Sequence, residues 1–530
     1  MEKHRDLKDL ISNMPMVMDV YWNMVGRKQI WREHYNLAGL EKCISHTVSD
    51  VMEYKANAPT GKRIFMFAAL HYWIEQTVAM GMALAGLGHQ VSFGYLPYSG
   101  WQKEVSEFEL RKRILYTQEI LKPANKVMQI IPMIDVKCGP VTPVLENIAH
   151  EIAIFDSQYT LQIEEISTDN SLYKLRYERS LLTARRFYNW LQTNQPDLVI
   201  VPNGTVHELA VLYRVAKMMG IDTVTFEFGD QKERIWMAQN HEIMRQDTDA
   251  LWHELGGGEI TSEHRETLVK MYAARKNACI WRNFARKWQE IPTEGARRLH
   301  SSLALDARPV VLLATNVLGD SLTLGRQIIT QTMAEWIKRT INLLYERKDI
   351  QLVIRIHPGE ILTRGTSMVE LIRAAFPELP DHIKLIGPDE KVNTYDLIEI
   401  ADVGLVYTTT VGLEMAMAGI PVIVSGITHY RNRGFTHDPN TWEEYVEEIE
   451  AILADHKRYR LSEERVELAW RYAYLFFFEF PFIFPWHLVY FRSDIQERSM
   501  SYVLSNEGQQ KYGETFRYLA GEPITYRFRR

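Results

Sequence analysis

The sequence has 530 residues, a length that predicts about two core domains with extensions rather than one ordinary domain. Hydrophobic residues make up 46% of the chain and charged residues 24%, which is typical of a folded protein and excludes an intrinsically disordered one. The net charge is -6, and the lack of a concentrated basic segment in the sequence argues against a nucleic-acid-binding protein.

The cysteines and the apolar segments indicate the compartment. Cys43, Cys138 and Cys279 lie far apart and share no metal-binding or redox spacing, so we expect reduced thiols in a cytoplasmic protein. The first residues are too charged for a secretory signal, and no apolar run approaches about 18 residues, so we expect no transmembrane helix. We expect the aromatic segment 476–486 to pack inside the protein rather than against a membrane.

The first half of the chain has the pattern of a Rossmann-like domain, placed at 61–276. After residues 1–60, which we expect to form a helical extension, the order is a strand at 64–70, a helix at 74–87, a glycine and a second strand. No G-x-G-x-x-G follows the first strand, which disfavours a dinucleotide, and we expect no cofactor. Further helices are predicted at 103–121, 173–193 and 206–219, and further strands at 197–201 and 223–227.

Acidic residues stand at the end of the strand predicted at 223–227. Glu227 ends the strand and Asp230 follows shortly after it. A carboxylate at a strand end that faces an interdomain cleft can accept a hydroxyl proton in a transition state. Either residue is therefore a candidate general base, and the alternative is an acid that caps the next turn.

Two other acids have the spacing of a metal-binding pair. Asp247 and Asp249 follow a polar, helical stretch rather than a strand, so we expect solvated surface residues. His207 and His241 each precede a glutamate but lack a second ligand at metal-binding spacing. We therefore predict no metal site, and activity that is independent of divalent metal.

A second Rossmann-like domain is predicted at 309–445, after a polar connecting segment at 277–308. Its first strand, 310–314, is followed by Thr315 and Asn316, in the loop where such a domain meets its ligand. Further strands are predicted at 383–386, 403–406 and 422–424, and helices at 328–347, 393–400 and 411–418.

A buried strand followed by His-Pro marks the first part of a candidate site. The apolar run 352–356 predicts a parallel strand that Pro358 stops. Arg355 and His357 therefore lie at its carboxyl end, where open α/β sheets bind their ligands. A histidine in that position is a site residue rather than a core residue.

A hydroxyl cluster marks the second part. Thr408, Thr409 and Thr410 precede the helix predicted at 411–418, where hydroxyls and backbone N–H groups bind anions, or else they only cap the helix. Glu414 lies where a carboxylate accepts hydrogen bonds from ribose hydroxyls, or else it is a surface acid. We expect His357 to face the threonines across adjacent strand ends and to stabilise a departing phosphate.

These motifs resemble those of the bacterial capsule polysaccharide biosynthesis family. The resemblance rests on His357-Pro358, on Thr408 to Thr410 leading into Glu414, and on the segment 419–436, and it covers about residues 309–445. That family is similar to the Kdo transferases and the bacterial sialyl- and polysialyltransferases. The resemblance implies the α/β GT-B fold, with two Rossmann-like domains facing a cleft and helical extensions at both ends.

The resemblance also implies an activity. It implies a glycosyltransferase that moves a sugar from a nucleotide-activated donor, favouring CMP-activated Kdo or a sialic-acid-like sugar, to a glycan or glycolipid acceptor of a bacterial surface or capsular polysaccharide. Such an enzyme is cytoplasmic, in peripheral contact with membrane-bound assembly machinery at the inner face of the membrane. The helices predicted over 446–530 resemble those that cross back to the first domain.

Roles for individual residues follow from the same resemblance. Glu227 stands where the family carries its acceptor-activating base, but Phe228 replaces a second acid of the family, so Asp230 is the nearby substitute. His357 is assigned to catalysis as well as to the donor. The residues expected to contact the donor nucleotide are Thr315, Asn316, Arg355, His357, Pro358, Thr408, Thr409, Thr410 and Glu414.

Two functions of other classes stay open. A capsule assembly or export factor of the same fold would bind nucleotide or glycan without turnover. A UDP-sugar 2-epimerase of the same fold would need acids and histidines from both halves of the cleft, and no acceptor.

Overall fold

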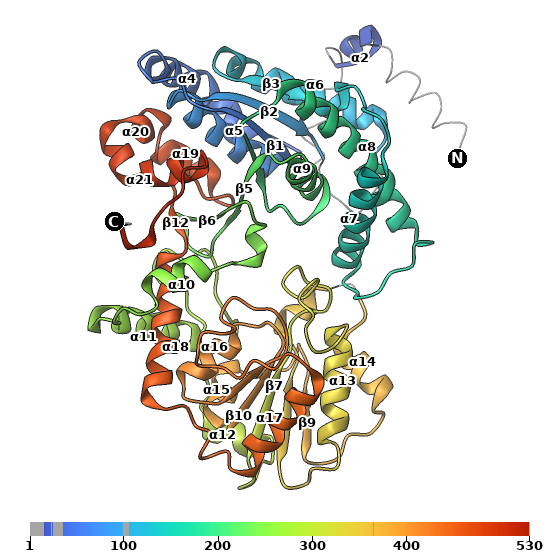
Figure 1. Cartoon of the computed structure of the whole chain (residues 1–530), viewed down its shortest axis with the longest axis vertical. Helices are drawn as coiled ribbons and strands as arrows, with labels where there is room; N and C mark the ends of the chain where they lie inside the picture. The colour runs from blue at the N-terminus through green and yellow to red at the C-terminus, as the bar shows by residue number, and fades with distance from the viewer. Residues whose placement is uncertain (1–14, 23, 25–34, 99–104, 364, 529–530) are drawn as a thin grey trace.

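The computed structural model describes residues 15–22, 24, 35–98, 105–363 and 365–528. They form two α/β domains, built on a seven-stranded and a five-stranded sheet, which face each other across a cleft (Figure 1). The predicted fold, two Rossmann-like domains in the GT-B arrangement, is confirmed. Within the extension predicted at 1–60, the described part contains α2 (Pro15–Tyr21) and α4 (Ala38–Lys55), and residues 1–14, 23 and 25–34 lie outside the described residues.

The first domain is organised on a sheet with the order β12-β6-β5-β4-β1-β2-β3. The strands from β5 to β3 are parallel, and only the pairs that involve β6 are antiparallel. β1 is a continuous apolar run in the middle of the sheet, which fits a strand covered on both faces. The strands are β1 (Arg63–Ala69), β2 (Gln90–Leu96), β3 (Gln129–Pro132), β4 (Leu198–Pro202), β5 (Asp222–Phe228), β6 (Arg234–Gln239) and β12 (Phe482–Ile483).

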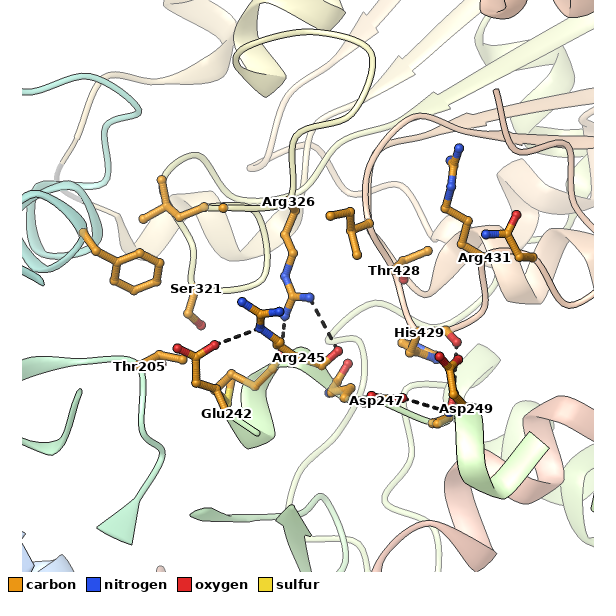
Figure 2. Close-up of a pocket in the computed structure, with 18 of the residues that line it drawn as sticks. Thr205, Glu242, Arg245, Asp247, Asp249, Ser321, Arg326, Thr428, His429 and Arg431 are labelled. Carbon is orange, nitrogen blue, oxygen red and sulfur yellow. Dashed lines mark hydrogen bonds and ion pairs between the residues drawn. The ribbon is translucent and has the colours of Figure 1, made fainter. Parts of the chain in front are cut away.

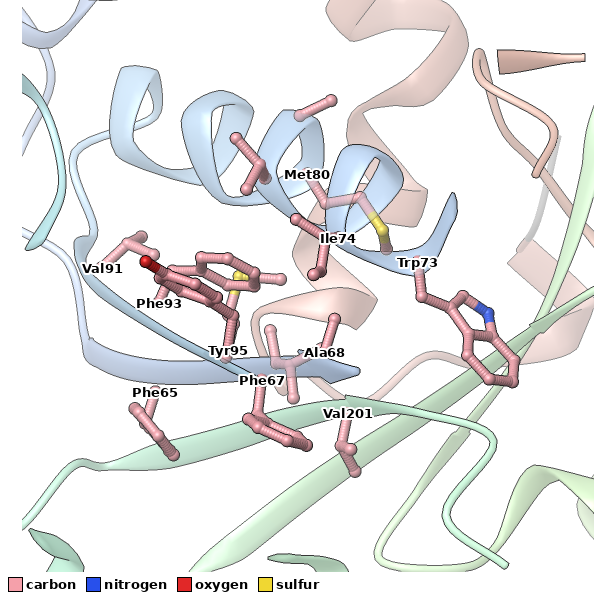
Figure 3. Packing of buried hydrophobic residues seen from close by; sticks show 14 of the residues in the cluster. Phe65, Phe67, Ala68, Trp73, Ile74, Met80, Val91, Phe93, Tyr95 and Val201 are labelled. Atoms are coloured by element: carbon pink, nitrogen blue, oxygen red, sulfur yellow. The ribbon is translucent and has the colours of Figure 1, made fainter. Parts of the chain in front are cut away.

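Helices cover both faces of this sheet. α5 (His71–Gly86) packs on one face, where a Cβ at Gly81 would lie 3.3 Å from the side chains of Met66 and Val91, so the helix can approach closely. On the other face Phe65 stacks on Trp190 with ring centroids 4.1 Å apart, and Figure 3 shows Phe65 pointing away from α5. The other helices here are α6 (Glu107–Leu121), α7 (Pro143–Leu161), α8 (Ser171–Asn194) and α9 (His207–Met218).

The second domain has a wholly parallel sheet with the order β11-β10-β7-β8-β9. Its strands alternate their apolar side chains between two cores, so helices pack on both faces. The strands are β7 (Val310–Ala314), β8 (Gln351–Arg355), β9 (Ile383–Ile386), β10 (Val403–Val406) and β11 (Val422–Val424). One core includes α13 (Met333–Leu344), α14 (Met368–Ala375) and α17 (Trp442–Ala454), and the other α15 (Thr394–Ile400) and α16 (Val411–Met417).

The chain passes between the domains at positions other than those predicted. α11 (Ser262–Lys276) lies within the range predicted for the first domain, but Leu268 and Met271 join the core of the second, where they meet α18 (Glu463–Tyr474). The return to the first domain begins at β12, not at 446. The remaining elements are α10 (Asp249–Leu255), α12 (Ala296–Ser302), α19 (Phe491–Glu497), α20 (Met500–Leu504), α21 (Asn506–Leu519), the π-helical turn η6 (Leu475–Glu479), and the 3₁₀ turns η2 (Lys122–Lys126), η3 (Met133–Asp135), η4 (Ile243–Arg245), η5 (Pro358–Leu362) and η7 (Tyr526–Phe528).

The two domains contact each other beside the cleft. After α7, a helix that the sequence analysis did not predict, Glu164 accepts hydrogen bonds from the N–H groups of Met333 (2.7 Å) and Ala334 (2.9 Å). The carboxylate of one domain thus caps the first turn of α13 in the other. Gly319 lies against Gln162, whose Cα would be 2.7 Å from a Cβ at that position, so only glycine allows this approach.

The aromatic segment 476–486 is packed inside the protein, as predicted. Phe476, Phe477 and Phe480 belong to the core of the second domain, and Phe482 and Trp486 belong to that of the first. Across the described residues, no helix combines the length and the apolar character that a membrane span requires.

Candidate active site in the interdomain cleft

Glu227 lies where the neighbouring strands β4 and β5 of the first sheet end. Asn203, which follows β4, donates a 2.8 Å hydrogen bond to one carboxylate oxygen of Glu227, and the N–H of Phe228 donates to the other at 3.1 Å. Burial raises the pKa of Glu227 to about 7, although both hydrogen bonds act to lower it. The side chain therefore exchanges its proton near neutral pH, as a general base must.

A buried tyrosine lies near carboxylates of both domains. Tyr159 is on α7, and burial together with the nearby charges of Asp320 and Glu227 raises its pKa to about 12. Asp320 belongs to the loop after β7 in the second domain. Tyr159 therefore lies within electrostatic range of a carboxylate from each side of the cleft.

Asp230 has a different environment from Glu227. Its carboxylate accepts a 3.0 Å hydrogen bond from Arg286 of the connecting segment, and the two form an ion pair. The pKa of His357 is lowered chiefly by burial, and the charge of Arg286 acts in the same direction. Asp230 and His357 belong to opposite domains, and the charge of Arg286 acts on both of them.

His357 lies two residues after the end of β8, at its carboxyl end as the sequence predicts, and Pro358 after it is exposed. The N–H of Gly359 donates a 3.0 Å hydrogen bond to Nδ1 of His357. Burial lowers the pKa of His357, an effect that Asp320 opposes. The neutral ring with Nδ1 as acceptor carries its proton on Nε2, which makes Nε2 a hydrogen-bond donor.

The expectation that His357 and the threonines stand on adjacent strand ends is wrong, because β7 lies between β8 and β10. The residues after β7 bridge the gap. Thr315 accepts a 3.1 Å hydrogen bond from the N–H of His357, and Asn316 accepts one of 3.2 Å from the N–H of Thr408. Thr315 and Asn316 therefore hold the ends of three strands together.

The three threonines differ in what their hydroxyls do. Thr408 donates to the carbonyl of Leu322 at 2.8 Å, and the hydroxyl of Thr409 accepts a 3.4 Å bond from the N–H of Val411. Thr410 is the N-cap residue of α16, and its side chain makes no capping hydrogen bond. Thr408 and Thr409 thus fix the turn with their hydroxyls, and the side chain of Thr410 is the most exposed of the three.

Arg355 and Glu414 are engaged within the protein. Arg355 is 3% exposed and donates to the carbonyls of Gly387 (2.5 Å) and Val392 (3.2 Å), which fixes the loop after β9. Glu414 is buried and accepts hydrogen bonds from Tyr395 (2.9 Å) and Arg275 (3.2 Å). Both side chains therefore hold segments of the protein together around the site.

A cavity of about 490 Å³ lies between the domains, beside these residues (Figure 2). Thr205 and Arg245 line it from the first domain, and Arg326 and Thr428 line it from the second. None of the residues that the sequence analysis assigned to the site lines this cavity. The connection is short, however, since the hydroxyl of Thr428 donates to the carbonyl of Thr408 at 3.3 Å.

The acidic pair Asp247 and Asp249 is exposed, as expected, but both residues line this cavity. Asp249 forms a 2.6 Å ion pair with Arg433 of the second domain. Within the described ranges, no group of three or more His, Cys, Asp or Glu side chains is arranged to hold a metal ion. The sequence feature that could have indicated this cavity is the charged loop after β11, which contains Arg431 and Arg433.

No protein-family model matches the chain, and no curated protein sequence matches it. Among solved structures, the chain is similar to the Thermosulfurimonas dismutans KpsC β-Kdo 2,4 transferase, with 18% identity over 52% of this chain and 78% of that one (TM-score 0.35). It is also similar to S. aureus MnaA in complex with UDP, with 12% identity over 77% and 91% of the two chains (TM-score 0.28). The Streptomyces sp. SF2575 glycosyltransferase SsfS6 matches with 13% identity over 78% and 95% (TM-score 0.23).

Proposed function

We propose that the protein is a glycosyltransferase that moves a sugar from a nucleotide-activated donor to a glycan acceptor, without a metal ion. The observation that carries the proposal is Glu227, a buried carboxyl group at a strand end of the first domain with its pKa raised to about 7, together with the imidazole of His357 after a strand end of the second. An acceptor hydroxyl needs a base near neutral pH, and a departing phosphate needs hydrogen-bond donors or positive charge.

The two domains supply the two halves of this chemistry. Glu227 takes the proton of the acceptor hydroxyl as the new glycosidic bond forms. Nε2–H of His357 donates to the phosphate oxygen as the bond to the donor sugar breaks, and Arg286 adds positive charge nearby. Thr315, Asn316 and the turn from Thr408 to Thr410 hold the strand ends on which the donor rests.

The donor and the setting come from the resemblance of the motifs. A CMP-activated sugar such as Kdo or a sialic-acid-like sugar is the favoured donor, and a bacterial surface or capsular polysaccharide is the acceptor. We place the enzyme in the cytoplasm, in peripheral contact with the membrane-bound machinery that assembles such polymers.

The test begins with nucleotide binding. Thermal shift measurements with CMP, UDP, TDP and GDP report binding, because a ligand that binds only the folded state raises its stability with concentration. We expect CMP to give the largest shift. Release of nucleotide from the preferred sugar donor is then measured with and without a glycan acceptor.

Acceptor-dependent release that Glu227→Gln abolishes, while nucleotide binding is kept, supports the proposal. Interconversion of a UDP-sugar in the absence of any acceptor identifies a 2-epimerase instead. Nucleotide binding without turnover on any donor and acceptor identifies a binding protein, and overturns the proposed activity.

A further inference from the structure

The cavity between the domains has a cationic end that its own carboxylates do not neutralise. Arg214 pairs with Glu151 at 2.7 Å, and Arg245 pairs with Glu242 at 2.8 Å, while Arg214 also lies 3.7 Å from Glu242. Arg326 lines the same end. Three guanidinium groups thus meet two carboxylates here, which leaves one positive charge in excess.

Arg326 is the source of that excess. It is 8% exposed, and its guanidinium donates to the backbone carbonyls of Met244 (2.5 Å) and Arg245 (3.5 Å). In the part of the chain that the structure describes, no carboxylate lies within ion-pair distance of it. The guanidinium of Arg326 is therefore hydrogen-bonded but its charge is not neutralised by a carboxylate, and an anionic ligand would supply the counter-charge.

Arg245 exposes a second guanidinium group to the cavity at the same end. Its side chain is 64% exposed while its Nε pairs with Glu242, and Figure 2 shows it directly beside Arg326. The other end of the cavity is formed by Asp247, and by Asp249 in its ion pair with Arg433. The cavity therefore combines polar and apolar lining, with positive charge in excess at the Arg326 end and paired charges at the other, which suits a sugar ligand that carries an anion at one end.

The cavity lies on the side of the proposed base. Thr205 lines it, and the N–H of Thr205 donates to Asn203 at 3.1 Å, while Asn203 holds Glu227 at 2.8 Å. The boundary toward His357 is the loop after β7, in which Ser321 lines the cavity and donates to Asp320 at 3.1 Å. The cavity thus connects to the base through Thr205 and Asn203, and to the Thr408 turn only through Thr428, and none of the residues assigned to the donor lines it.

We infer that this cavity binds the acceptor, and that the acceptor is an anionic sugar whose carboxylate or phosphate group is held by Arg245 and Arg326. This inference rests on the proposed glycosyltransferase function and names its acceptor class. A planar guanidinium recognises either oxyanion through paired N–H donors.

The test measures binding directly, in the absence of any donor, by calorimetry at constant ionic strength. A hyaluronan tetrasaccharide, which carries glucuronate, is compared with the same tetrasaccharide after reduction of its carboxyl groups. Glucose 6-phosphate is compared with glucose. We expect at least one charged probe to bind about tenfold or more tightly than its neutral partner, and the better of the two identifies the oxyanion.

Variants locate the contact. Arg326→Gln, which keeps an N–H donor for the carbonyl of Met244, and Arg245→Gln should each weaken binding of the charged probe by about tenfold to a hundredfold and leave the neutral probe unchanged. Arg308→Gln is the control, because Arg308 pairs with Asp306 at 2.8 Å and does not line the cavity. Melting temperatures of all variants exclude loss of the fold as the cause.

Equal binding of charged and neutral probes, no binding of either charged probe, or unchanged affinity in both cavity variants would overturn this inference. The proposed activity fails separately. Acceptor-dependent nucleotide release with no preference for anionic acceptors leaves the function standing and removes the acceptor class. Selective binding of the charged probe without any transfer keeps the anionic-ligand site and removes the proposed activity.

Discussion

Replacing Glu227 by Gln tests the central residue through both stability and rate. Burial raises the pKa of this carboxyl group from an ordinary value of 4.5 to about 7. Since one pKa unit corresponds to about 1.4 kcal/mol, keeping the carboxylate ionised in the folded protein costs roughly 3 kcal/mol. Gln cannot ionise, so the variant escapes this cost while keeping an acceptor for Asn203.

The pH dependence has a definite sign. Below pH 4.5 the carboxyl group is protonated in the folded and unfolded states alike, and its ionisation contributes nothing. Above about pH 7 it is ionised in both states and the full penalty applies. We therefore expect the stability of Glu227→Gln relative to the wild type to rise by about 3 kcal/mol between pH 4.5 and 7.

The assay is urea denaturation of both proteins at several pH values from 4.5 to 8. Glu165→Gln, the same substitution at an exposed carboxyl group, serves as the matched control. In parallel, transfer should fall by about 10²- to 10⁴-fold in Glu227→Gln. Stability curves that stay parallel across this range, or a variant with normal transfer, would refute the assignment of Glu227 as a buried base.

Three further predictions concern other parts of the site. His357→Ala should slow transfer by about 10²- to 10³-fold and weaken nucleotide binding at an unchanged melting temperature, and near-normal transfer would remove His357 from the phosphate site. Turnover should survive EDTA, because the described residues hold no cluster of metal-ligating side chains; loss that Mn²⁺ or Mg²⁺ restores would point back to Asp247 and Asp249. Glu164→Ala should lower stability by about 1 kcal/mol through loss of the cap on α13, with exposed Glu165→Ala as the control, and equal stability of the two variants would contradict this role.

Local patterns in the sequence were sufficient for the strands of the second domain, whereas β3, β6 and β12 of the first sheet were not predicted. β7, β9, β10 and β11 have the predicted bounds, because a short continuous apolar run is typical of a strand that is buried on both faces. Pro358 stops the run of β8, so the place of His357 after that strand was also predictable. The order of the strands was not predictable in this way. The position of β7 between β8 and β10 depends on pairing between segments far apart in the chain.

Side-chain partners distant in sequence were also beyond local patterns. Glu414 looked available to a ribose, yet it pairs with Arg275, which lies 139 positions away on α11. Arg326 had no motif around it, and its importance depends on a cavity that exists only when both domains are in place. The Thr408 to Thr410 turn, by contrast, was recognisable because the hydroxyls are consecutive.

The late return of the chain to the first domain has a consequence for biogenesis. β12 pairs with β6 through Phe482 and Ile235, and Phe482, Phe484 and Trp486 are at most 1% exposed in the first domain's core. A ribosome that has just completed β6 has therefore not yet made one edge of the sheet or part of its core. The whole second domain emerges before those residues do, so the first domain can reach its final state only after the second is synthesised, and the exposed edge of β6 is a natural site for a chaperone in the interval.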